Sequence, residues 1–168
     1  MSVNTAKVWV SLLEASYLAF GLEPYHRSFN KRVGKTPKLY FYDTGLVCYL
    51  LGIDGPEALR DHYLYGQIAE TYLVAERVET YTNRGRRPRL SFWREGNRHE
   101  VDLLEEAGAE LPRACELKGG RTFRSAWFGE LARWREVTGA GREETAVVYC
   151  GEEAQAGILG WRGWLGGE

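Results

Sequence analysis

Two short stretches decide the fold, His99-Glu100-Val101-Asp102-Leu103-Leu104 and Cys115-Glu116-Leu117-Lys118. Polar and apolar residues alternate in both, which predicts strands over Glu100–Glu105 and Arg113–Lys118. The residues between them, Ala107-Gly108-Ala109, suit a hairpin turn. The sequence therefore predicts an antiparallel pair of strands that carries an aspartate, a glutamate and a lysine.

The register of this hairpin decides whether the three polar groups meet. Side chains two residues apart on a strand share a face, so Glu116 and Lys118 lie together. If the turn places Ala107 opposite Leu111, Asp102 lies opposite Glu116, close enough for both carboxylates to share one cation. A slip of one residue would put the two carboxylates on opposite faces. The sequence permits the first register without selecting it.

Two adjacent carboxylates and an amine are suited to metal-assisted hydrolysis of a phosphodiester. Carboxylate oxygens of Asp102 and Glu116 are the ligands that Mg²⁺ or Mn²⁺ prefers, and such a cation lowers the pKa of a bound water. Lys118 would orient that water or stabilise developing negative charge. Glu70, on the preceding helix, would supply a further ligand or position a second metal. The alternative is a solvated sheet face with a cross-strand ion pair.

The segments around the hairpin predict a mixed α/β domain. Helical periodicity extends from Gly66 to about Thr80 and from Ser125 to Val137, and Thr145–Cys150 is apolar throughout, as in a strand buried on both faces. With a further strand at Leu90–Arg94, the order from the long helix onward is helix, three strands, helix, strand. Residues 158–165, which contain two tryptophans, receive no assignment.

The N-terminal third of the chain predicts a smaller unit. We expect a helix from a cap at Asn4 to Ala15 and strands at Tyr17–Leu22 and Lys38–Tyr42. Asp43 and Thr44 can then cap a short helix at Gly45–Leu51. This order is typical of the back half of a winged helix. A junction at Asp54-Gly55-Pro56 divides the chain into residues 1–53, a partial winged helix, and residues 54–168, the domain that carries the carboxylates.

Basic residues cluster in two loops. The predicted wing contains Lys31, Arg32 and Lys35, for which packing is favoured over contact with DNA. Arginines beside Phe92 and Trp93 suit a nucleic-acid backbone, and the alternative is a solvated arginine-rich turn. These arginines are Arg84, Arg86, Arg87, Arg89, Arg94 and Arg98.

Composition limits the classes of protein that fit the chain. The 168 residues have a formal net charge of −1, with 44% hydrophobic and 27% charged residues, so neither a strongly basic nor a membrane-surface protein is indicated. Three cysteines, far apart and without a paired-cysteine motif, predict neither a zinc site nor a disulfide framework. Without a signal peptide or an apolar membrane span, we expect a cytoplasmic protein.

The order of these elements resembles the PD-(D/E)XK nuclease superfamily, in which a helix with a glutamate precedes an aspartate and a Glu-x-Lys. The resemblance implies a metal-dependent nuclease with Glu70, Asp102, Glu116 and Lys118 as its site residues. The metal ligands would be Asp102, Glu116 and Glu70, and the ion would be Mg²⁺ or Mn²⁺.

Short motifs in the sequence also resemble a prokaryotic family of ATP-binding proteins. These proteins have an AAA+-like P-loop ATPase domain, a winged helix and a nuclease-like C-terminal domain. The motifs that carry this resemblance include Lys35-Thr36-Pro37-Lys38-Leu39-Tyr40-Phe41, Asp43-Thr44-Gly45-Leu46, Phe92-Trp93-Arg94 and Glu116-Leu117-Lys118. The ATPase part is absent, and Phe29 stands where a phosphate loop would begin with glycine, so we expect no ATP site.

These resemblances imply two functions from different classes. The first is a metal-dependent nuclease-like domain that hydrolyses or binds DNA phosphodiesters. The second is a catalytically inactive module of nuclease fold that binds DNA or protein as the C-terminal part of an AAA+-like ATPase. The partners would then be DNA, an ATPase domain or a second copy of the chain.

Overall fold

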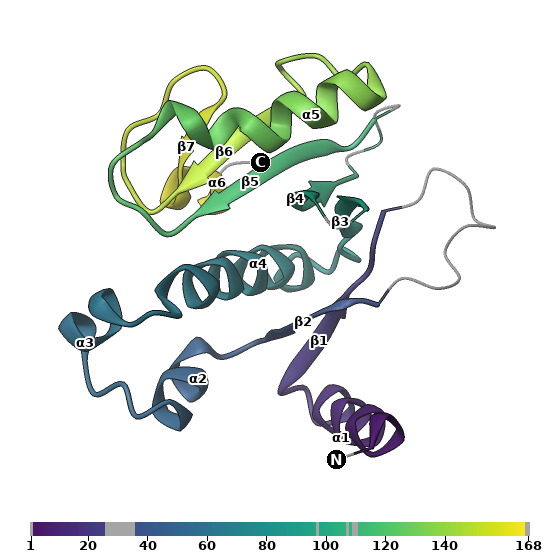
Figure 1. The fold of residues 1–168 in the computed structure, drawn as a ribbon, viewed down its shortest axis with the longest axis vertical. Helices are drawn as coiled ribbons and strands as arrows, with labels where there is room; N and C mark the ends of the chain where they lie inside the picture. Colours follow the sequence, from purple (N-terminus) through teal and green to yellow (C-terminus); the bar gives the residue numbers. More distant parts are fainter. Residues whose placement is uncertain (1, 26–35, 97, 107, 109–110, 167–168) are drawn as a thin grey trace.

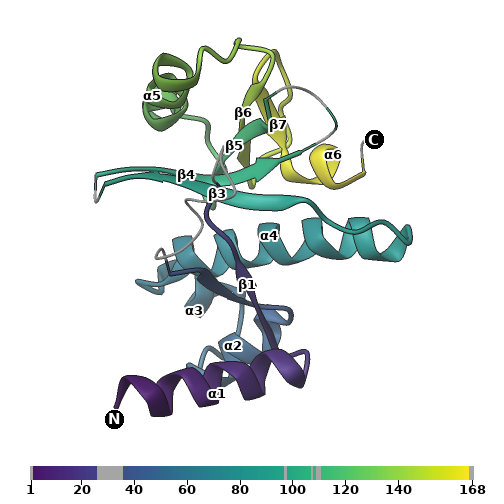
Figure 2. The same cartoon turned by 90° about the vertical axis from the view of Figure 1, so that its right-hand side faces the viewer.

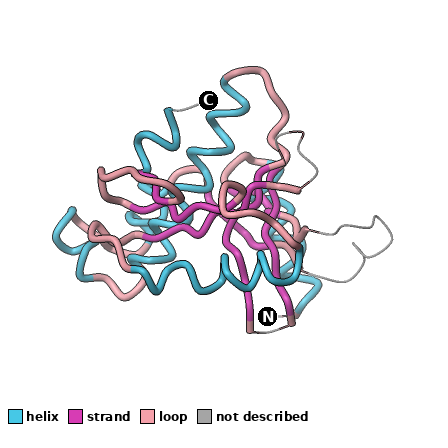
Figure 3. Tube along the Cα trace, turned by 90° about the horizontal axis from the view of Figure 1, so that it is seen from above, coloured by secondary structure: helices cyan, strands magenta, loops and turns pink. Residues whose placement is uncertain are grey.

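The computed structural model describes residues 2–25, 36–96, 98–106, 108 and 111–166. A five-stranded sheet in the order β3-β4-β5-β6-β7 forms its centre. The strands are β3 (Leu90–Glu95), β4 (His99–Glu105), β5 (Arg113–Lys118), β6 (Thr145–Tyr149) and β7 (Ile158–Gly160). The first three pair antiparallel, whereas β5, β6 and β7 run parallel, so the sheet is mixed. Figure 3 shows the strands in the middle of the molecule with helices around them.

The hairpin adopts the first of the two registers that the sequence leaves open. Leu103 pairs with Cys115 and Leu104 with Ala114, which is the register that aligns Asp102 with Glu116. The ladder ends at the first of these pairs. Beyond it, the main-chain N–H of Leu117 donates to Asp102 Oδ2 at 2.9 Å. The aspartate side chain thus bridges β4 and β5 where their backbone ladder ends.

One long helix covers each face of this sheet. On one side lies α4 (Tyr65–Asn83), and on the other lies α5 (Gly129–Thr138), which follows the 3₁₀ turn η2 (Ser125–Phe128). Figures 1 and 2 show the layers in the order α5, sheet, α4. Alternation along the strands explains the two cores, since Leu103, Cys115 and Leu117 face α4 while Leu104 and Ala114 face α5.

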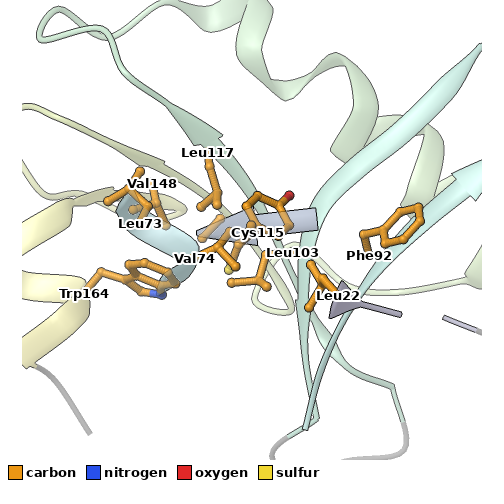
Figure 4. Close-up of a cluster of buried hydrophobic side chains, with 11 residues drawn as sticks. Leu22, Leu73, Val74, Phe92, Leu103, Cys115, Leu117, Val148 and Trp164 are labelled. Carbon is orange, nitrogen blue, oxygen red and sulfur yellow. The ribbon is translucent and has the colours of Figure 1, made fainter. Parts of the chain in front are cut away.

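The α4-side core includes residues from both ends of the chain. Leu73 and Val74 of α4 pack there with Leu22 from the N-terminal segment and Trp164 from the C-terminal helix, as Figure 4 shows. Each fully buried aliphatic side chain of this kind contributes roughly 2 kcal/mol to the free energy of folding. The N-terminal segment is therefore part of the central packing.

That segment consists of α1 (Val3–Ala15), β1 (Ala19–Leu22), β2 (Lys38–Phe41) and α2 (Thr44–Leu50). Its two strands form an antiparallel hairpin. The expected wing tip, with Lys31, Arg32 and Lys35, lies outside the described residues. The N-cap predicted at Asn4 is wrong, because the side chain of Ser2 accepts from the N–H of Thr5 and starts the helix earlier. The cap expected at Asp43 is confirmed for α2.

The hairpin reaches the central sheet at Phe92 of β3. The N–H of Tyr25 donates to the Phe92 carbonyl at 2.6 Å, and the N–H of Phe92 donates to the Glu23 carbonyl at 3.0 Å. Phe92 is itself 1% exposed. Its ring is therefore buried and offers no surface on which a nucleic-acid base could stack. The short helix α3 (Pro56–Asp61) links the N-terminal segment to α4.

The unassigned tail forms a strand and a helix, β7 and α6 (Trp161–Gly166). The carbonyl of Trp164 accepts from Arg77 Nη1 at 3.0 Å, and the same guanidinium donates to Glu105 Oε2 at 2.7 Å through Nη2. This buried ion pair ties α6, α4 and β4 together. Within the described part of the chain, no helix combines the length and apolarity needed to cross a bilayer.

Candidate functional site

The site begins at Asp102, in the fork where β4 and β5 stop pairing. One carboxylate oxygen, Oδ2, accepts from the Leu117 N–H and lies 3.7 Å from Lys118 Nζ. The other, Oδ1, lies 3.9 Å from Lys38 Nζ. The side chain of Asp102 is 12% exposed. A mostly buried carboxylate thus has one lysine at each of its oxygens.

Glu116 and Lys118 lie together, as the alternation along β5 predicted. Lys118 Nζ donates to Glu116 Oε1 at 2.5 Å while remaining within ion-pair distance of Asp102. The second oxygen of Glu116, Oε2, is buried and has no hydrogen-bond partner among the described residues. The structure therefore brings Asp102, Glu116 and Lys118 to one point. It leaves one buried acceptor there unsatisfied, which is costly without a cation or a donor.

Lys38 is the unexpected member of the site. Its ammonium lies 2.9 Å from Glu70 Oε1 and 2.5 Å from Glu100 Oε1, besides its contact with Asp102. Lys38 begins β2, so it comes from the N-terminal segment, whereas the three carboxylates come from α4 and β4. One mostly buried ammonium, 18% exposed, therefore lies within reach of carboxylates on two other elements.

Tyr40 belongs to the same cluster. It lies two residues after Lys38 on β2, so both side chains are on one face. Its hydroxyl donates to Glu70 Oε1 at 2.6 Å. Glu70, expected as an additional metal ligand, thus has its Oε1 occupied by an ammonium and a phenol. Burial and the charge of Glu70 raise the pKa of the Tyr40 hydroxyl, which keeps it a donor.

Burial and like charge dominate the titration of the two central carboxylates. Burial, followed by the charge of Glu70, raises the pKa of Asp102 to about 6, although both lysines act against this. Burial, followed by the charge of Asp102, raises the pKa of Glu116 to about 8. Both carboxyls therefore favour the protonated form more than usual. An added cation between them would reverse that preference.

Unlike the two carboxyls, the two lysines of the site favour their charged form. Burial acts to lower the pKa of Lys118, but the charges of Asp102 and Glu116 outweigh it, and the net pKa is raised. The same balance raises the pKa of Lys38, through Glu70, Glu100 and Asp102. Both amines therefore stay charged at neutral pH. Neither is prepared to act as a proton acceptor, so their roles are electrostatic.

The donor set fits a divalent cation through Asp102 and Glu116. The fit rests on the unpaired Oε2 of Glu116 and on the mutual repulsion of two buried carboxyls. Only Asp102 and Glu116 contribute to this fit. Among the described residues, no group of three or more His, Cys, Asp or Glu side chains is arranged to hold a metal ion. Water or main-chain oxygens would have to complete the coordination.

The arginines expected at a nucleic-acid backbone fall into two groups. Arg84, Arg86, Arg87 and Arg89 are exposed in the segment between α4 and β3. At the opposite end of β3, the guanidinium of Arg94 pairs with Glu100 and lies 5.2 Å from the centre of the Phe92 ring. Arg94 and Arg98 line a small hollow of about 220 Å³ with His99 and Glu100. Only this second group is next to the carboxylates.

Sequence reasoning found four members of the site and missed Lys38, Tyr40 and Glu100. A lysine and a tyrosine two residues apart on a strand are a usable signal, since a half-buried face that carries a cation requires an anion opposite it. Nothing in the local sequence shows that this strand packs against α4, however. The pairing joins residues 32 and 30 positions apart in the chain, and the tertiary fold alone creates it.

These features define a class of protein: a mixed α/β domain with a carboxylate–lysine cluster in the fork between two strands. The family described as a domain of unknown function (DUF4143) matches residues 65–160, more than half of the chain. The protein therefore belongs to the DUF4143 family. A second domain of unknown function (DUF8612) matches residues 1–57, so Lys38 and Tyr40 lie in one matched segment and their acidic partners in the other.

Two mycobacterial proteins are similar to most of the chain. They are the uncharacterized proteins Rv2008c of Mycobacterium tuberculosis and Mb2031c of Mycobacterium bovis. Each is 29% identical over 155 residues, a match that covers 89% of this chain and 32% of the relative. The chain thus spans about a third of the length of these relatives. No solved structure matches it.

Proposed function

We propose that this protein is a nuclease-like domain of the PD-(D/E)XK type, which hydrolyses DNA phosphodiesters with Mg²⁺ or Mn²⁺. The observation that carries the proposal is the convergence of Asp102, Glu116 and Lys118 in one fork of the sheet. If the cluster were only a buried structural ion pair, we would expect every carboxylate oxygen in it to have a hydrogen-bond partner. In the part of the chain that the structure describes, Glu116 Oε2 has no hydrogen-bond partner, which supports a site that takes up a further cation.

Each residue of the site has a distinct role in this proposal. Asp102 and Glu116 would hold the cation, which when bound neutralises phosphate charge and lowers the pKa of a bound water. Lys118 keeps its charge beside both carboxylates and stabilises negative charge that develops on the phosphate. Glu116 must lose its proton before it binds a cation. We therefore expect cation binding to strengthen as the pH rises toward 8.

The test is cleavage of supercoiled plasmid DNA with Mg²⁺ or Mn²⁺. Wild type should cut, while Asp102→Ala and Lys118→Ala should lose at least about a hundredfold in rate, as expected when a group stabilising the transition state is removed. Glu57→Ala, on the exposed side of α3, is the matched control and should cut normally. Equal cleavage by the wild type and both site variants would exclude this assignment.

A second candidate is a catalytically inactive nuclease fold that binds DNA or protein as part of a longer ATPase. Lys38 favours it, since one internal ammonium already compensates Glu70, Glu100 and Asp102. Isothermal titration with Mn²⁺ separates the candidates. No heat of binding with wild type or with Lys38→Met would favour the inactive module. Binding that disappears in Glu116→Gln would favour the nuclease.

A further inference from the structure

A cavity of about 420 Å³ lies where β5 and β6 end, and its lining includes residues from the N-terminal half of α4. The two parallel strands stay together to the bond from Cys150 N–H to the Lys118 carbonyl, at 3.1 Å, and the chain then diverges. Crevices beyond the carboxyl ends of parallel strands are common ligand sites. We call this cavity the aromatic–arginine pocket. Its chemically distinctive residues are Arg60, Tyr65, Tyr72, Arg121, Trp161 and Arg162.

The walls of the pocket are aromatic and held in place. The Tyr65 hydroxyl donates to the Gly119 carbonyl at 2.8 Å. The rings of Tyr72 and Trp161 lie 5.5 Å apart, edge to face. The backbone is close as well, since a Cβ on Gly119 would approach the Ala69 Cβ to 2.8 Å. Planar rings held in this way provide surfaces on which a flat heterocycle can stack.

The mouth of the pocket carries positive charge. Within the described part of the chain, neither Arg60 nor Arg121 has a hydrogen bond or an ion pair, and both guanidinium charges act on the Tyr65 hydroxyl. Arg162 lies over the Trp161 ring at 4.6 Å and pairs with Glu152 at 3.0 Å. Three arginines against one glutamate, in a chain of net charge −1, make this pocket locally cationic.

Stacking surfaces and guanidinium groups together match a nucleotide. A guanidinium binds a phosphate through paired N–H donors, and the aromatic rings accept a base of any type. A base inside a duplex has both faces covered by its neighbours, so it cannot enter such a pocket. An unpaired base can enter without that cost.

From these observations we infer that the aromatic–arginine pocket binds one nucleotide of a single-stranded nucleic acid, with its phosphate at Arg60 and Arg121. The biological use of this pocket rests on the proposed nuclease function. Gly119, which lines the pocket, directly follows Lys118 of the site in the chain. The domain therefore selects single strands or frayed ends over intact duplex.

Binding is measured by fluorescence anisotropy with a labelled oligothymidylate of about ten nucleotides, within the site size of single-strand binders. EDTA is present, so no cleavage occurs. We expect Arg60→Ala and Arg121→Ala each to weaken binding about fivefold to tenfold. Each should also reduce the salt slope by about 0.7, as one lost phosphate contact predicts for single strands. Arg124→Ala, an exposed arginine outside the pocket, should bind as wild type does.

Two further measurements complete the test: competition by small anions and binding of a duplex. Thymidine monophosphate should displace the strand at lower concentration than inorganic phosphate, and a hairpin duplex should bind at least about tenfold more weakly than the single strand. Unchanged binding by both arginine variants would overturn the inference. So would equal competition by inorganic phosphate, which would indicate an anion site only, or equal affinity for duplex.

The two proposals fail in different ways. Strand binding through Arg60 and Arg121 without any plasmid cleavage would refute the nuclease function and support the pocket. If either arginine can be replaced without loss of cleavage or of strand binding, the nuclease function would be supported and the pocket refuted.

Discussion

Replacing Lys38 by methionine tests the role of the internal ammonium. Methionine keeps the length and apolar character of the side chain and removes the charge. The change leaves Glu70, Glu100 and Asp102 without their shared cation, and these side chains are 23%, 29% and 12% exposed. We expect a large loss of stability, because partly buried carboxylates would repel one another in a medium that screens poorly.

The magnitude follows from the partners that remain. Removing one member of a buried ion pair costs about 3–5 kcal/mol. Here Tyr40 still donates to Glu70, Arg94 still pairs with Glu100, and Lys118 still lies beside Asp102. These contacts reduce the expected loss to about 2–3 kcal/mol in the free energy of unfolding. For a chain of this size, that lowers the melting temperature by roughly 4–12 °C.

The pH dependence gives a sharper test. The Lys38 pKa is raised, so its stabilising effect is complete below its ordinary value of 10.5 and is lost as the pH rises further. Burial acts to raise the Glu100 pKa, but bonds from Lys38 and Arg94 lower it overall. Its stabilising effect is therefore present above 4.5 and lost as the pH falls. The difference between wild type and Lys38→Met should be greatest between about pH 5 and 10.

Urea unfolding, followed by circular dichroism from pH 4 to 9, measures this difference. Lys7→Met, an exposed lysine on α1, is the matched control and should change stability by less than about 0.5 kcal/mol. A loss below about 0.5 kcal/mol for Lys38→Met, or one that does not shrink on acidification, would refute the account of Lys38 as the cation of the cluster.

Three further changes have defined outcomes. Because the Glu116 pKa is raised from 4.5 to about 8, the wild type loses stability as the pH rises through that range, so Glu116→Gln should melt higher than wild type at pH 9 and show little difference at pH 4. Arg77→Met should lower the free energy of unfolding by about 3–5 kcal/mol by leaving Glu105 buried without its ion pair, and a double-mutant cycle with Glu105→Leu should recover most of that loss in urea titrations. Gly119→Ala should cost about 1–3 kcal/mol through the close contact with an α4 alanine, whereas Gly66→Ala, with no atom within 4 Å of the added Cβ, should be neutral or stabilising by up to about 1 kcal/mol in thermal melts. Equal effects of the two glycine changes would argue against the close approach of β5 to α4.

Local sequence was sufficient for the elements whose signals are periodic. Alternation predicted β4 and β5 to within one residue, and the apolar run predicted β6. Asp43 marked the start of α2. By contrast, β7 and α6 were missed, because a strand of three residues and a helix of six are too short for a periodic pattern to stand out.

The candidate site divides in the same way. The sequence by itself determined that Glu116 and Lys118 share a face of one strand, since side chains alternate along any strand. Only the tertiary structure decided that the hairpin adopts the register that aligns Asp102 with Glu116, and that Lys38 reaches the acidic cluster from an N-terminal strand. Such contacts depend on which surfaces pack together, and that is a property of the whole chain's buried surface, which no local pattern encodes.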